Sequence, residues 1–114
     1  MNEQITEAEF QKNAETAIAQ LEASFARVAE DRDLDVQVES GVLSVEFDEG
    51  EPGKFIVSPN SSVRQLWVSA RVSSFKFDWS DEAGGFVLAG TGESLKQVMT
   101  RLTREQLSDA TIEL

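Results

Sequence analysis

The stretch AEDRDLDV, residues 29–36, places four acidic side chains within six positions. Glu30, Asp31, Asp33 and Asp35 are separated only by one arginine and one leucine. Like charges this close repel one another, so the clustering of these acids needs an explanation. Carboxylate oxygens are hard ligands that suit ferrous, ferric, calcium or manganous ions. The chain contains no cysteine or histidine, so nothing in it selects zinc or copper.

These acids have two interpretations. In the first, Asp33 and Asp35 form the solvent-facing side of a strand, and Glu30 and Asp31 belong to the loop before it. In the second, a carboxylate ridge binds metal and includes two acids of the preceding helix: Glu15, Glu22, Glu30, Asp31, Asp33 and Asp35. Exposed carboxylates without a preformed cage would bind a metal weakly, and salt would screen the binding.

The charge of the chain is unevenly distributed. Residues 1–51 hold 14 acids and three bases, and residues 52–114 hold seven of each, so the whole net charge of -11 lies in the first half. Such a surface repels nucleic acid and anionic lipid and attracts cations and basic proteins. No apolar run approaches the roughly 20 residues of a membrane span. The polar start MNEQITEAEF is unlike a signal peptide, and we expect a cytoplasmic protein.

The first predicted element is a long helix. Thr6 and Glu9 have the spacing of a capping box, in which each side chain accepts a hydrogen bond from the backbone of the other residue. Glu15 and Glu22, seven residues apart, fall on one flank of the apolar stripe. The stripe itself repeats at three- and four-residue steps and is predicted to be core: Phe10, Ala14, Ala17, Ile18, Leu21, Phe25 and Val28.

After this helix the apolar period changes to two, which is typical of strands. Leu34, Val36 and Val38 alternate with polar residues, and SerGly at 40–41 turns the chain into a second alternating run. Further strands are predicted at 54–57, 65–70, 75–79 and 85–88, and Thr91 is predicted to cap a second helix. The expected fold class is α+β: a two-layer α-β sandwich in which two helices pack on one face of an antiparallel sheet of about six strands. Residues 1–114 are expected to form a single domain.

One tryptophan lies at a strand position whose side chain is predicted to point away from the core. In QLWVSA, residues 65–70, the alternation assigns Leu66, Val68 and Ala70 to the core, so Trp67 should be exposed on the outer face of the sheet. An exposed tryptophan is typical of an interface, although long side chains could instead cover it through a cation–π contact. The predicted partner-binding residues are Gln65, Trp67, Ser69 and Lys76.

The segments GVLSVEF, KFIV, QLWVSA, FKFDW and TGES, in this order and spacing, resemble the frataxin family, known in bacteria as CyaY. The resemblance covers nearly the whole chain. It implies an α-β sandwich that binds iron weakly through an acidic ridge and docks on the cysteine desulfurase and the scaffold protein of iron–sulfur cluster assembly. The chain departs from the family pattern late in its first helix, where Arg27 and several alanines replace acids, so the centre of the ridge should move to residues 30–35.

The function expected from these observations is an iron-binding accessory and regulator of iron–sulfur cluster assembly, without catalytic residues or an organic cofactor. It is expected to be a monomer, with iron-dependent oligomerisation as an alternative. An acidic protein-interaction module with no physiological metal role is the alternative function. A ferroxidase is least favoured, because no buried carboxylate cluster with two-metal spacing can be read from these strands.

Overall fold

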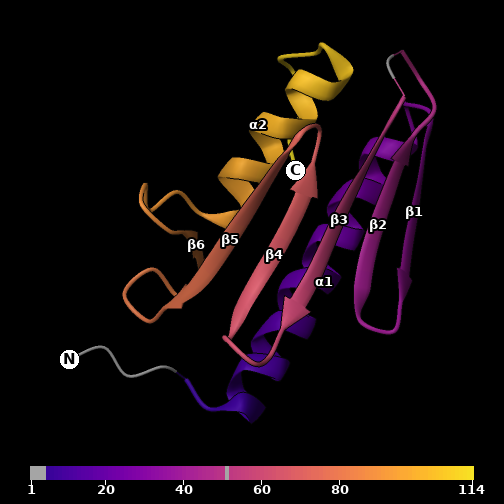
Figure 1. Ribbon diagram of the computed structural model, residues 1–114. Helices are drawn as coiled ribbons and strands as arrows, with labels where there is room; N and C mark the ends of the chain where they lie inside the picture. The colour runs from indigo at the N-terminus through magenta and orange to yellow at the C-terminus, as the bar shows by residue number, and fades with distance from the viewer. Residues whose placement is uncertain (1–4, 51) are drawn as a thin grey trace.

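The computed structural model describes residues 5–50 and 52–114. The elements follow in the order α1 (Glu7–Ala29), β1 (Leu34–Glu39), β2 (Val42–Phe47), β3 (Gly53–Asn60), β4 (Gln65–Ala70), β5 (Ser73–Ser80), β6 (Gly85–Leu88) and α2 (Leu95–Leu107). The strands form one antiparallel sheet in the order β1-β2-β3-β4-β5-β6, each paired with its neighbour in sequence. Both helices lie on one side of this sheet (Figure 1), which confirms the predicted α-β sandwich.

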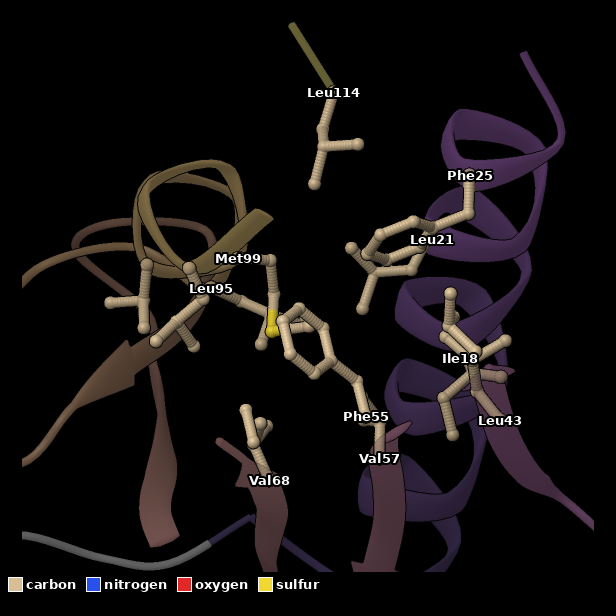
Figure 2. Packing of buried hydrophobic residues seen from close by; sticks show 14 of the residues in the cluster. Ile18, Leu21, Phe25, Leu43, Phe55, Val57, Val68, Leu95, Met99 and Leu114 are labelled. Carbon is tan, nitrogen blue, oxygen red and sulfur yellow. The ribbon is translucent and has the colours of Figure 1, made fainter. Parts of the chain in front are cut away.

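The core lies between the helices and the sheet. Figure 2 shows Ile18, Leu21 and Phe25 of α1 facing Met99 of α2 above Phe55 of the sheet. The predicted stripe of α1 is buried apart from Ala17, which is partly buried against it. Burying one large apolar side chain stabilises the fold by about 1.5–3 kcal/mol, so this layer of residues fixes where α1 crosses the sheet.

Hydrogen bonds at the two helix starts set where each helix begins. The predicted capping box of α1 is confirmed: the Glu9 N–H donates to the Thr6 hydroxyl at 3.1 Å, and the Thr6 N–H donates to the Glu9 carboxylate at 3.2 Å. The predicted cap of α2 is wrong, because Ser94 and not Thr91 precedes the helix and forms a capping box with Gln97. The φ of +76° at Gly92 prevents the helix from starting earlier.

The edge strand β1 differs from its predicted alternation. Leu34 is buried and Val36 is partly buried, but Val38 is 39% exposed. β1 pairs only with β2 and forms one edge of the sheet, so the core covers it incompletely toward its end. Among the described residues, neither helix is long and apolar enough to cross a membrane.

Candidate metal site and partner-facing surface

The hairpin β1–β2 places acids from two strands side by side. Its turn residues Ser40 and Gly41 both have positive φ, 53° and 78°, as a tight two-residue hairpin turn requires. The resulting register sets Asp35 directly opposite Glu46. Both side chains are exposed and point away from the helices, because the buried residues of β1 and β2 alternate with them.

Three carboxylates converge at this hairpin. Oxygen atoms of Asp35, Glu46 and Asp48 all lie within 4.8 Å of one another, and we call these three residues the carboxylate triad. Within residues 5–50 and 52–114, the triad is the one group of three or more acids that comes this close. Asp35 is one of the acids predicted from the sequence as metal ligands, whereas Glu46 and Asp48 are not among them. The available signal was the SerGly turn, which fixes the register that brings Glu46 to Asp35.

The backbone holds the triad in place at the end of β2. The Asp48 N–H donates to the carbonyl of Asp33 at 3.0 Å, and the Asp33 N–H donates to the Glu49 carboxylate at 3.0 Å. The pKa of Asp48 is raised above its usual value, first by partial loss of hydration and then by repulsion from Asp33, Asp35 and Glu46. A cation bound among these oxygens would relieve this repulsion.

Arg32 is the base inside the acidic stretch, and its side chain bonds to residues after β2 and at the end of α2. Its guanidinium pairs with Glu49 at 2.5 Å and with Asp109 at 2.6 Å, and it donates to the carbonyl of Leu107 at 3.3 Å. The hydrogen bond from Arg32, followed by the one from the Asp33 N–H, lowers the pKa of Glu49. Part of the acidic crowding is therefore neutralised within the fold, whereas the triad has no basic partner among the described ion pairs.

The other predicted ridge acids lie outside the triad. Glu30 and Asp31 are exposed at the end of α1, and Asp33 adjoins the triad through its contacts with Asp48. Glu15 and Glu22 are exposed on α1 and line a separate groove between this helix and the turn of the β1–β2 hairpin. The six predicted acids are therefore spread along α1, the segment after it and β1, and Asp35 is the one of them that belongs to the triad.

Trp67 is exposed on the outer face of the sheet, as its parity predicted, with 38% of its surface accessible. The ammonium of Lys76, directly opposite on β5, lies 4.9 Å from the centre of the indole ring. The indole N–H donates to the Gln65 side chain at 3.0 Å, and that amide donates to Asp78 at 3.0 Å. Ser69 is exposed on the same face. These contacts fix the ring while leaving its surface accessible.

The protein is thus an acidic α-β sandwich, with two helices on one face of an antiparallel sheet and exposed acids at the junction of the first helix and strand. A sequence model described as the frataxin-like domain matches residues 3–109. The chain therefore belongs to the frataxin (CyaY) family, which confirms the resemblance.

Relatives and solved structures agree with this assignment. The chain is 37% identical over 107 residues to the iron-sulfur cluster assembly protein CyaY of Azotobacter vinelandii, an alignment that covers 92% of each chain. It is 35% identical over 104 residues to CyaY of Pseudomonas aeruginosa, covering 90% of this chain and 91% of that protein.

Two solved frataxins share the fold. Frataxin from Psychromonas ingrahamii superposes with a TM-score of 0.73 at 18% identity, covering 96% of this chain and 97% of that one. Trimeric frataxin from the yeast Saccharomyces cerevisiae, complexed with ferrous iron, gives a TM-score of 0.71 at 19% identity, covering 96% and 92%.

Proposed function

We propose that this protein is an iron-binding accessory and regulator of iron–sulfur cluster assembly and carries no catalytic residues of its own. The observation that carries the proposal is the carboxylate triad, whose three exposed side chains converge within 4.8 Å. Two similarities support it: the relatives are named iron–sulfur cluster assembly proteins, and the yeast neighbour is complexed with ferrous iron. In this proposal residues 1–114 act as a single frataxin-like domain.

Asp35, Glu46 and Asp48 would supply the first oxygen ligands of the iron, and Asp33 stands next to them. The remaining predicted acids, Glu15, Glu22, Glu30 and Asp31, would extend the negative field that attracts the cation. Because the triad is exposed, water would complete the coordination and binding would be weak and reversible. Protons compete for the same oxygens, so binding should weaken as the pH falls through the raised pKa of Asp48.

The two faces of the molecule would meet different partners. We assign the surface that carries the acids of α1, β1 and the segment between them to a basic surface of the cysteine desulfurase, because the net charge of -11 favours a positive partner. We assign the outer sheet face around Gln65, Trp67, Ser69 and Lys76 to the scaffold protein. An exposed indole held by two neighbours offers a rigid aromatic anchor, which is the kind of residue that dominates interface energies.

A reconstituted cluster-assembly assay tests the proposal. The double variant Glu46→Gln with Asp48→Asn removes two ligands of the triad, and Glu82→Gln with Glu105→Gln removes two exposed charges elsewhere as a matched control. We expect the triad variant to bind ferrous iron about tenfold more weakly and to lose any iron-dependent effect on the rate of cluster formation. An iron-dependent response that is unchanged in the triad variant would contradict the triad as the iron site. No iron-dependent response in the wild type would support the alternative, an acidic interaction module without a metal role.

A further inference from the structure

Glu15 and Glu22 have no place in the carboxylate triad, and their position suggests a different use. They line a groove of about 280 Å³ between the first half of α1, the β1–β2 turn and the end of β3. Phe10, Ala14 and Ile18 of α1 lie beneath the groove and are at most 4% exposed, and the exposed apolar residues that line it are Ala19, Val38 and Pro59. Its outer part includes Val38, whose side chain belongs to the edge strand and is 39% exposed.

The charged residues that line the groove are acidic. Glu15 and Glu22 are exposed, and none of the described residues that line the groove is basic. Exposed apolar side chains beside two carboxylates are complementary to an apolar group that carries positive charge on either side. The volume lies just below the roughly 300–1,000 Å³ of pockets for drug-sized ligands, which favours an inserted side chain over a whole small molecule.

The spacing of the two carboxylates indicates the form of the occupant. Seven residues of α-helix separate them by about 10.5 Å along the axis of α1. In an extended peptide, residues i−2, i and i+2 face one side, and the outer two lie about 13 Å apart. Lysine or arginine at the outer positions can therefore reach Glu15 and Glu22 while the central apolar side chain enters the groove.

We propose that this groove is a docking site for an extended basic segment of a partner protein, which inserts an apolar side chain between α1 and Val38. Glu15 and Glu22 bind the flanking cations. The site is separate from the carboxylate triad, and its occupation does not require metal. The groove selects for an apolar side chain, whereas the acidic surface around it attracts any cation.

The test uses a defined peptide, acetyl-SKSLSKS-amide, and a matched peptide in which serine replaces leucine. Binding is followed by amide NMR shifts of the full chain. We expect shifts centred on Ile18, Val38 and Gly41, and at least fivefold tighter binding of the leucine peptide. Ala19→Phe, which fills the groove from an exposed position, should weaken binding tenfold, whereas Ala89→Phe on a remote exposed loop should change it less than twofold.

Charge variants complete the test. Glu15→Gln with Glu22→Gln should weaken binding of the leucine peptide about tenfold, and Glu82→Gln with Glu105→Gln less than threefold. Equal binding of the two peptides, or equal losses in both charge variants, would show unspecific attraction and overturn the proposal. Self-association that Ala19→Phe abolishes, or equally tight binding of hexylammonium, would assign the groove to another occupant and also overturn it. Manganese binding by the triad should be the same in wild type and Ala19→Phe, so the proposed metal function is tested separately.

Discussion

Replacing Trp67 with alanine should separate folding from partner binding. In the structure the indole makes two specific contacts, the Lys76 ammonium at 4.9 Å from the ring centre and the Gln65 side chain at 3.0 Å. With 38% of its surface exposed, the residue contributes little to the core. Trp67→Ala should therefore leave the sheet and both helices intact.

The two contacts set the magnitude of the effect on stability. A cation–π contact at an exposed site contributes about 0.5–1 kcal/mol, and a hydrogen bond contributes about 0.5–1.5 kcal/mol. We expect Trp67→Ala to lower the free energy of unfolding by about 1–2.5 kcal/mol, and Tm by about 4–10 °C. If the indole is buried at the scaffold interface, its loss should cost about 2 kcal/mol of binding or more, which is roughly a 30-fold rise in Kd.

Urea unfolding and calorimetric titration with the scaffold protein measure the two quantities. Val63→Ala is the control, because Val63 is equally exposed at 40% and lies in the turn before β4. It should leave the scaffold affinity unchanged. A loss of more than about 4 kcal/mol of stability in Trp67→Ala would place the indole in the core. An unchanged scaffold affinity would refute the assignment of this face to the partner.

Three further predictions concern the acidic side. Between the ordinary pKa of aspartate and the raised pKa of Asp48, the folded state binds more protons than the unfolded state, so stability should rise as the pH falls through this window. Asp48→Asn should abolish this rise in stability, which is measured by urea unfolding from about pH 7 to about pH 4. The same pH dependence in the variant and in the wild type would show that Asp48 does not cause the rise. The lowered pKa of Glu49 acts in the opposite sense: its stabilisation is present above its ordinary pKa and is lost as the pH falls through the folded value. Arg32→Met should lower stability at neutral pH and reduce that acid-dependent loss; equal stability of the variant and wild type at neutral pH would show that the ion pair contributes nothing. Asp33→Asn with Asp35→Asn should raise the urea midpoint by relieving repulsion and weaken manganese binding, whereas a large destabilisation would show that these carboxylates hold the fold together.

The fold could be predicted from the sequence because its two periodicities are clear. The stripe of α1 and the alternation in β4 each have one partner layer to face, so burial follows directly from spacing. The predictions from sequence were wrong where the burial or conformation of a residue depends on neighbouring parts of the fold. Val38 has the core parity but lies at the uncovered end of an edge strand, and Ser94 replaced Thr91 as the cap because Gly92 turns the chain before α2.

The site was harder to predict than the fold. An acidic run marks where carboxylates gather along the chain, but a metal cluster needs carboxylates that meet in space. Glu46 reaches Asp35 only through the hairpin register, and Asp48 reaches them through its backbone bond to Asp33. The role of Arg32 was also hidden, because its partners Glu49 and Asp109 are distant in sequence.

The position of the metal site is tested most directly by titrating the isotope-labelled protein with manganous ions and following the broadening of its amide NMR signals. The triad predicts that Asp35, Glu46 and Asp48 broaden first, at the lowest metal concentration, while β5 and β6, at the other end of the sheet, stay sharp. Glu46→Gln with Asp48→Asn should remove this early broadening. Uniform broadening across the chain, or first broadening at Glu15 and Glu22, would contradict a metal site at the carboxylate triad.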